Sequence, residues 1–187
     1  MNMLPVQGVI IGGALLMSIV WLTPAAIITR QAAFATAAPS ATCQLEAATI
    51  TGTAGDDILV GTPGRDVIVG LRGNDRIEGL GGNDVICGNE GNDGLFGSAD
   101  DDTLFGGDGD DTLSGGADDD TLFGEAGTDG LLGGDGIDAL LGGADGDFLS
   151  GSDDNDFLNG GTGTDNGDGG PGFNSCVNLE IETNCQA

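Results

Sequence analysis

The 187-residue sequence contains no histidine, lysine or tyrosine, and only one tryptophan. Without histidine and lysine the commonest general bases, Schiff-base chemistry and histidine-ligated zinc or iron are excluded. The only basic side chains are four arginines, which face 31 acidic residues and leave a net charge of −27. A chain with this charge repels nucleic acid and favours cations as partners.

The acidic residues are confined to the larger, C-terminal part of the chain. All 31 lie at or after Glu46, where only Arg65, Arg72 and Arg76 oppose them, so this part carries 3 − 31 = −28. Such a chain repels itself unless bound cations neutralise it. Its acids therefore predict either a bound cation or a disordered acidic linker.

Residues 1–42 are of a different kind, with no acid, an apolar run over residues 8–29 and an Ala-rich linker after it. The run and the small-residue site Ala33-Phe34-Ala35 are typical of a cleaved signal peptide, although no basic residue precedes the run. The alternative is a retained N-terminal membrane segment, because about 22 apolar residues can span a bilayer. We expect a secreted, extracellular protein, or in the alternative one that is membrane-anchored at the cell surface.

Glycine is abundant, with 38 residues, and it is periodic. Thirteen nine-residue units fill residues 52–168 without insertion or deletion, each with Gly at position one and Asp at position six. Position eight is Leu or Ile in every unit except the last, where Gly167 replaces it. The position-six residues are Asp57, Asp66, Asp75, Asp84, Asp93, Asp102, Asp111, Asp120, Asp129, Asp138, Asp147, Asp156 and Asp165.

The unit G-x-x-G-x-D-x-[LI]-x predicts a loop followed by a short strand. The glycine-rich first six residues can turn through positive φ, and the last three are long enough for one extended segment. Only the middle residue of such a segment points to a chosen face, so position eight faces inward and positions seven and nine face outward. One strand per nine residues buries nothing alone, so the units must stack into an all-β parallel solenoid.

The unit resembles the haemolysin-type, or RTX, calcium-binding nonapeptide repeat, Gly-Gly-x-Gly-x-Asp-x-hydrophobic-x. Residues 79–87 (GLGGNDVIC) and 106–114 (GGDGDDTLS) match this consensus closely. Four units have Asp in place of Gly at position four, and because Asp tolerates a left-handed conformation the turn can survive there. These residues are Asp100, Asp118, Asp145 and Asp154.

The resemblance implies a right-handed parallel β-roll with two units per turn and Ca²⁺ held between stacked loops on the same edge. The position-six aspartates are then the side-chain ligands. Unit one pairs with unit three and so on, which allows six sites on one edge and five on the other, or up to about eleven Ca²⁺ ions with oxygen ligands. Their charge of roughly +22 offsets most of the −28, so we expect binding and folding to be coupled.

Four cysteines agree with an oxidising destination. Cys176 and Cys185 lie in residues 169–187, which we interpret as a C-terminal disulfide cap. Cys43 then pairs with Cys87 and ties an N-terminal cap, residues 43–51, onto the fourth unit; other pairings and free thiols are the alternatives. The apolar side chains expected to cover the C-terminal end are Phe173, Leu179 and Ile181.

Position nine of the even-numbered units forms an outward column that is more apolar than that of the odd-numbered units. It predicts a docking face for a protein or polymer partner or a second copy, or cover by the Cys43 segment folding back; simple β-propensity is the alternative. The column comprises Val69, Cys87, Phe105, Phe123 and Leu141.

The sequence thus predicts a secreted calcium-binding protein that is not an enzyme, with no catalytic residue assigned. A calcium-rigidified surface or adhesion module is the alternative function. A calcium-assisted polysaccharide lyase is less favoured, because it would rest on Arg65, Arg72 or Arg76 beside a bound ion, and these arginines already relieve repulsion among neighbouring aspartates.

Overall fold

The computed structural model describes residues 10–11, 14–15, 42–44 and 46–186, and the chain divides into two parts, Met1–Thr36 and Ala37–Ala187. In the first part, β1 (Ile10–Ile11) pairs antiparallel with β2 (Ala14–Leu15). The rest of the predicted signal peptide or membrane segment lies outside the described residues. Among the residues that are described, no helix has the length and apolar character needed to cross a membrane.

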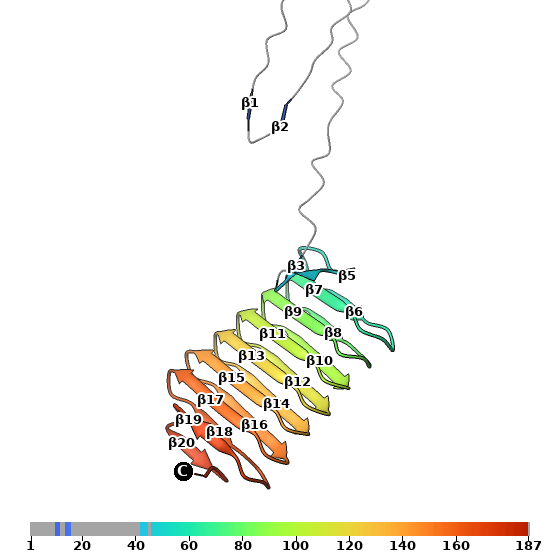
Figure 1. Cartoon of the computed structure of the whole chain (residues 1–187). Coiled ribbons are helices and arrows are strands. Elements are labelled where there is room, and N and C mark those ends of the chain that lie inside the picture. Colours follow the sequence, from blue (N-terminus) through green and yellow to red (C-terminus); the bar gives the residue numbers. More distant parts are fainter. Residues whose placement is uncertain (1–9, 12–13, 16–41, 45, 187) are drawn as a thin grey trace, which may run out of the picture. The chain divides into compact units, whose positions relative to one another are not determined.

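The second part is a parallel β-solenoid in which successive strands alternate between two eight-stranded sheets (Figure 1). We call the sheet built from odd-numbered units the odd sheet and the other the even sheet. The odd sheet contains β6 (Ile58–Val60), β8 (Arg76–Glu78), β10 (Gly94–Ala99), β12 (Thr112–Ala117), β14 (Gly130–Asp135), β16 (Phe148–Asp153), β18 (Asn166–Asp168) and β20 (Ile181–Thr183). The even sheet contains β5 (Ile50–Thr51), β7 (Val67–Arg72), β9 (Val85–Glu90), β11 (Thr103–Asp108), β13 (Thr121–Ala126), β15 (Ala139–Ala144), β17 (Phe157–Thr162) and β19 (Ser175–Val177).

The register of both sheets follows from the repeat. Leu95 pairs with Leu113, and Leu113 pairs with Leu131, so that partners lie 18 residues, or two units, apart. This confirms the prediction of a parallel solenoid with two units per turn. The register changes only at the C-terminal end, where Asn166 pairs with Ile181, 15 residues away.

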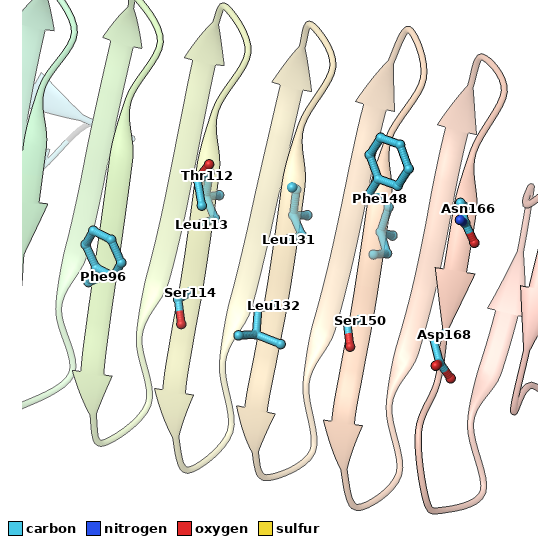
Figure 2. A pocket seen from close by; sticks show the side chains of 12 residues that line it. Phe96, Thr112, Leu113, Ser114, Leu131, Leu132, Phe148, Ser150, Asn166 and Asp168 are labelled. Carbon is cyan, nitrogen blue, oxygen red and sulfur yellow. The ribbon is translucent and has the colours of Figure 1, made fainter.

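The core is a double row of position-eight side chains between the two sheets. It confirms the predicted inward position, because eleven of these residues are buried: Ile68, Ile77, Ile86, Leu95, Leu104, Leu113, Leu122, Leu131, Leu140, Leu149 and Leu158. Ile50 and Leu59 pack on this row at the N-terminal end, and Cys176 and Leu179 at the C-terminal end. Seen from outside the odd sheet, Ser114 and Leu132 stand on the surface (Figure 2).

Both predicted disulfides are present, Cys43–Cys87 and Cys176–Cys185. Cys43 belongs to β3 (Thr42–Cys43), which pairs antiparallel with β4 (Glu46–Ala47). Cys43 packs with Val67, Val69 and Cys87 in a second small apolar cluster on the outer face of the even sheet. The predicted folding back of the Cys43 segment onto this face is therefore confirmed.

We expected the outer face of the even sheet to be more apolar than that of the odd sheet. For the side chains that remain exposed to solvent, this expectation is wrong. Val69 is 1 % exposed beneath the Cys43 segment, while Phe105 and Phe123 stack on each other with ring centroids 4.7 Å apart. The large apolar side chains most open to solvent on the sheets belong to the odd sheet, at positions seven and nine, whereas Phe157 and Val177 on the even sheet are each 39 % exposed. Those of the odd sheet include Ile58, Val60, Leu132 and Phe148, and Leu132 and Phe148 line a shallow groove of about 490 Å³ with Phe96 (Figure 2).

Of the three apolar residues predicted to cover the C-terminal end of the core, one does so. Leu179 packs on the core, whereas Phe173 is 78 % exposed and Ile181 is 58 % exposed. The nine-residue register explains the difference. Residues 169–177 (GGPGFNSCV) form a fourteenth unit, in which Cys176 takes the inward position eight and Phe173 lies in the loop at position five.

Candidate metal centre

The position-six aspartates form two rows, one along each edge of the solenoid where the loops stack. From Asp66 to Asp165 all of these side chains are buried, and Asp57 at the N-terminal end is half-buried. Buried carboxylates are costly unless hydrogen bonds or cations compensate them. Each row must therefore hold its charge by one of these means.

One oxygen of each carboxylate is compensated by the backbone. The N–H of Asp93 donates to Asp111 Oδ1 over 2.7 Å, and the N–H of Asp111 donates to Asp129 Oδ1 over 2.8 Å. The same bond recurs along both rows between aspartates 18 residues apart, as from Asp84 to Asp102 over 2.8 Å, and only the last acceptor of each row is another residue type. The Oδ1 atoms thus set the spacing of successive loops.

The other oxygen, Oδ2, is buried without any hydrogen-bond partner in eleven of these aspartates, among the residues that the structure describes. They divide into six on the odd edge and five on the even edge. The residues are Asp75, Asp93, Asp111, Asp129, Asp147 and Asp165 on the odd edge, and Asp84, Asp102, Asp120, Asp138 and Asp156 on the even edge. A bound cation would compensate a buried anionic oxygen that has no donor.

In ten of the eleven units a backbone carbonyl oxygen lies together with the unpartnered Oδ2 beside the position-one glycine. A Cβ built on Gly106 would clash with Asp111 Oδ2 and would lie 2.8 Å from the carbonyl oxygen of Gly124. The even edge has the same arrangement, since a Cβ on Gly97 would clash with Asp102 Oδ2 and lie 2.8 Å from the carbonyl oxygen of Gly115. Position one is glycine because two oxygens of neighbouring loops converge where a side chain would begin.

The prediction that Asp at position four keeps the left-handed turn is confirmed. Asp100, Asp118, Asp145 and Asp154 have φ between 70° and 77°, in the left-handed region that the loop requires. Glycines fill this position in the other strained loops, such as Gly109 with φ 132°. The four loops with Asp therefore keep the same turn.

Burial changes the acidity of the rows. It raises the pKa of Asp102, Asp111 and Asp120 from 3.8 to about 7, and neighbouring carboxylates add to the increase while the backbone N–H bond opposes it. Burial likewise raises the pKa of Asp129, Asp138 and Asp147 to about 6. Without a cation, the carboxyls at the centre of each row thus stay protonated to a higher pH than ordinary aspartates do.

The donor set fits calcium. Each place offers a carboxylate oxygen and carbonyl oxygens from stacked loops, and hard cations such as Ca²⁺ take six to eight oxygen ligands. Thiol or imidazole ligands, which zinc and copper prefer, are not part of either row. No cluster of three or more carboxylate, thiol or imidazole side chains suited to a metal occurs in the described part of the chain.

Sequence reasoning missed four residues at the ends of the rows. Thr53 and Thr62 donate to Oδ2 of Asp57 and Asp66, while Asn174 and Glu180 accept from the N–H groups of the last aspartates. The sequence could have identified Asn174, because residues 169–177 (GGPGFNSCV) continue the nine-residue register with Asn at position six. Glu180 follows the three-residue change of register, and the repeat gave no sign of it.

These features define a class: a parallel β-roll with rows of oxygen ligands for metal ions along its loop edges. The family model of the RTX calcium-binding nonapeptide repeat matches the chain four times, at residues 48–70, 60–95, 96–131 and 132–166. The matches cover more than half of the 187 residues, so the chain belongs to the RTX calcium-binding nonapeptide repeat family. No curated protein matches the chain.

Proposed function

We propose that the protein binds Ca²⁺ through its position-six aspartates and folds into the β-roll on binding, outside the cytosol. The unpartnered Oδ2 atoms carry this proposal, because eleven anionic oxygens are buried without a donor, and in ten of these units a carbonyl oxygen lies with Oδ2 beside the position-one glycine. One ion at each gives eleven ions, six on the odd edge and five on the even edge. Asp57 and Asp66 are excluded from this set, since threonine donors occupy their Oδ2 atoms.

Charge supports coupling between binding and folding. The region from Glu46 onward carries −28, and about eleven divalent ions supply roughly +22. Without them the folded state brings the aspartates of each row to hydrogen-bonding distance of the next loop, where their charges repel. The metal-free chain is therefore largely unfolded, and calcium provides the folding free energy.

An extracellular location is supported by the two disulfides, which form and persist in oxidising compartments. A binding function without catalysis is supported by the residue types, because histidine, lysine and tyrosine are absent from the sequence. The predicted partner on the even face has less support. The Cys43 segment covers its N-terminal portion and only Phe105, Phe123 and Leu141 remain, each partly buried.

The experiment is a calcium titration of the chain from zero to 10 mM, followed by far-UV circular dichroism, with magnesium as control. We expect a cooperative transition from coil to strand that calcium produces and magnesium does not. Isothermal titration calorimetry over the same range gives the number of ions. A spectrum that calcium leaves unchanged would overturn the proposed function.

A further inference from the structure

At the N-terminal end of the aspartate rows the Oδ2 atoms have protein donors, whereas in the middle of each row only the Oδ1 atoms have them. Asp57 Oδ2 accepts from the N–H of Thr53 over 2.6 Å and from Thr53 Oγ1 over 2.9 Å. Asp66 Oδ2 accepts in the same way from Thr62, over 2.7 Å and 2.9 Å. These two units are also the only ones with Thr at position two. Their Oδ2 atoms are therefore satisfied without an ion.

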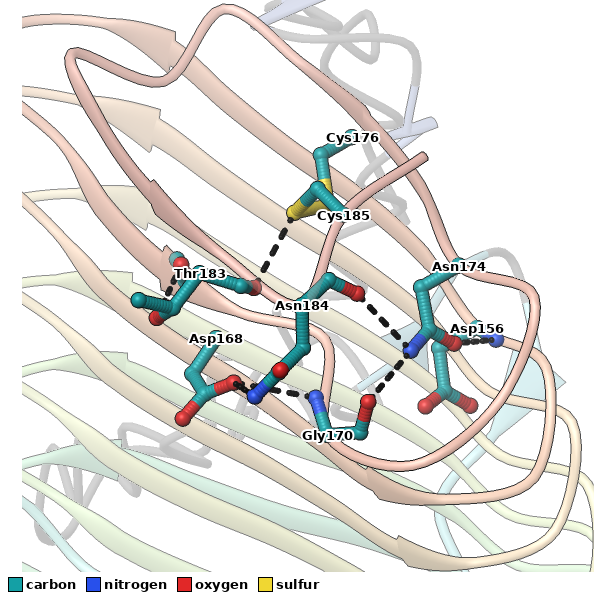
Figure 3. The surroundings of a disulfide bond; sticks show 9 residues. Asp156, Asp168, Gly170, Asn174, Cys176, Thr183, Asn184 and Cys185 are labelled. Atoms are coloured by element: carbon teal, nitrogen blue, oxygen red, sulfur yellow. Dashed lines mark hydrogen bonds between the residues drawn. A yellow bond between two sulfur atoms is a disulfide. The ribbon is translucent and has the colours of Figure 1, made fainter. Parts of the chain in front are cut away.

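The even row ends on an amide instead of a carboxylate. Asn174 stands at position six of the fourteenth unit, is 1 % exposed, and continues the row because its Oδ1 accepts from the N–H of Asp156 over 2.7 Å. Its Nδ2 donates to the carbonyl oxygens of Gly170, over 3.0 Å, and Asn184, over 3.2 Å (Figure 3). One buried NH₂ group thus bridges two carbonyl oxygens.

That NH₂ group occupies the place of the unpartnered oxygen in the regular units. A Cβ built on Gly169 would lie 2.7 Å from both Asn174 Nδ2 and the carbonyl oxygen of Asn184. The equivalent neighbours of Gly106 are Asp111 Oδ2 and the carbonyl oxygen of Gly124. In the middle of the roll two oxygens lie beside the position-one glycine, an arrangement that a cation would satisfy; at the C-terminal end a hydrogen-bond donor takes the place of one of the two oxygens.

We propose that Thr53, Thr62 and Asn174 take the place of calcium at the N-terminal ends of both rows and at the C-terminal end of the even row, which makes these three row ends metal-independent. The inference rests on the proposed calcium binding of the eleven middle units. Its physical reason is that an ion needs oxygens from stacked loops, and the terminal loops have a neighbour on one side only. A donor within the chain satisfies the buried acceptors there, where an ion would lack ligands.

Other bonds that need no metal gather at the same ends. Cys43–Cys87 ties the N-terminal turns together, and Cys176–Cys185 closes the C-terminal turn. The three ion pairs of the described residues also lie toward the N-terminal end: Arg65–Glu46, Arg72–Glu90 and Arg76–Glu78. Among the residues that the structure describes, the middle turns contain neither a disulfide nor an ion pair. Calcium dependence is thus concentrated between the two caps.

The test is Asn174→Asp in the full-length chain, with calcium stoichiometry measured by isothermal titration calorimetry. The carboxylate recreates the oxygen pair of the middle units, so we expect one more ion per chain than in the wild type. Asn155→Asp is the matched control, because it adds the same charge at an exposed position five and should add no ion. An Asn174→Asp variant that folds in calcium with the wild-type number of ions overturns the inference.

The reverse substitution, Asp102→Asn, covers the case in which Asn174→Asp does not fold. Here the amide should replace an ion in the middle of the even row. We expect one ion fewer per chain and a strand signal that appears at lower calcium concentration than in the wild type. Unchanged stoichiometry, or a folding midpoint at higher calcium, counts against the inference. Wild-type protein that binds no calcium overturns the proposed function instead, so the two failures are distinguishable.

Discussion

Leu179 fills the space beside Gly167, where a Cβ built on the glycine would overlap Leu179 Cδ1. Gly167 is the single break in the Leu/Ile series at position eight of the thirteen units. Because it has no side chain, it leaves room for the side chain of Leu179, which lies 12 residues later in the sequence. Leu179 thereby completes the apolar row and closes its C-terminal end. The exception in the repeat is part of the cap.

Leu179→Ala should therefore destabilise the calcium-loaded roll, by less than the about 2 to 5 kcal/mol of a fully buried leucine because Leu179 is only partly buried. Gly167→Leu alone should also destabilise it, since two side chains would compete for one space. The double variant should recover part of the loss, because the leucine introduced at position eight would restore the regular row. Urea unfolding in saturating calcium measures all three, and additive losses in the double variant would contradict this packing.

Leu113→Ala tests the inward position in the middle of the row. Leu113 is fully buried, so the expected loss is about 2 to 5 kcal/mol of unfolding free energy. Leu132→Ala is its control, because Leu132 lies on the same sheet but is 44 % exposed, and it should cost much less. Thermal or urea unfolding in calcium measures both variants; equal losses would show that burial does not distinguish the two positions.

Asp111→Ala tests the side-chain ligands. It removes both the Oδ1 acceptor of the Asp93 N–H and the unpartnered Oδ2, so the calcium concentration at the folding midpoint should rise. Asp108→Ala removes an equal charge from an exposed side chain three residues away and should change the midpoint much less. Circular dichroism during calcium titration gives both midpoints. Equal shifts would indicate that only net charge matters.

Gly106→Ala tests the space that the proposed ion shares with position one. An alanine Cβ would clash with Asp111 Oδ2 and crowd the Gly124 carbonyl, so we expect weaker calcium binding and the loss of about one ion per chain. Gly130→Ala is the control, because the nearest atom to its built Cβ, the Asp111 carbonyl oxygen, is 3.9 Å away. Calorimetric stoichiometry separates the two variants; an unaffected Gly106→Ala would mean that the oxygens converge elsewhere.

The regular part of this fold was predictable because one physical requirement repeats at each position. Position eight must be apolar to build a core, position one must leave room for two oxygens, and the phase never shifts over residues 52–168. The ends were less predictable because each is built once. Asn174 kept the register but not the residue type, and Glu180 accepts from Asp165 across a change of register that only the folded chain reveals.

The outer faces were predicted least well, for a related reason. Whether an outward side chain is exposed depends on segments outside the repeat, such as the Cys43 segment over Val69. It also depends on neighbours two units away, as in the Phe105–Phe123 stack. Neither is encoded in a single unit. The periodic pattern specifies which way a residue points, and the non-periodic ends decide what covers it.

The metal-free chain should gain strand structure as the pH falls. Burial raises the pKa of Asp102, Asp111 and Asp120 from 3.8 to about 7 in the folded state, so folding without metal takes up protons. That stabilisation is complete below the ordinary pKa and disappears as the pH rises through about 7. In a chelator, circular dichroism should therefore show more strand at pH 5 than at pH 8.

Calcium binding should show the opposite pH dependence, because protons and ions compete for the same oxygens. The calcium midpoint should be higher at pH 5 than at pH 8, and ions that bind at Asp111 and Asp138, whose pKa values are about 7 and about 6, should release protons in that range. Calorimetry in two buffers of different ionisation enthalpy measures that release. If acid instead removes strand in the chelator and leaves the calcium midpoint unchanged, then the buried carboxylates do not control folding, and the ions must bind elsewhere on the roll.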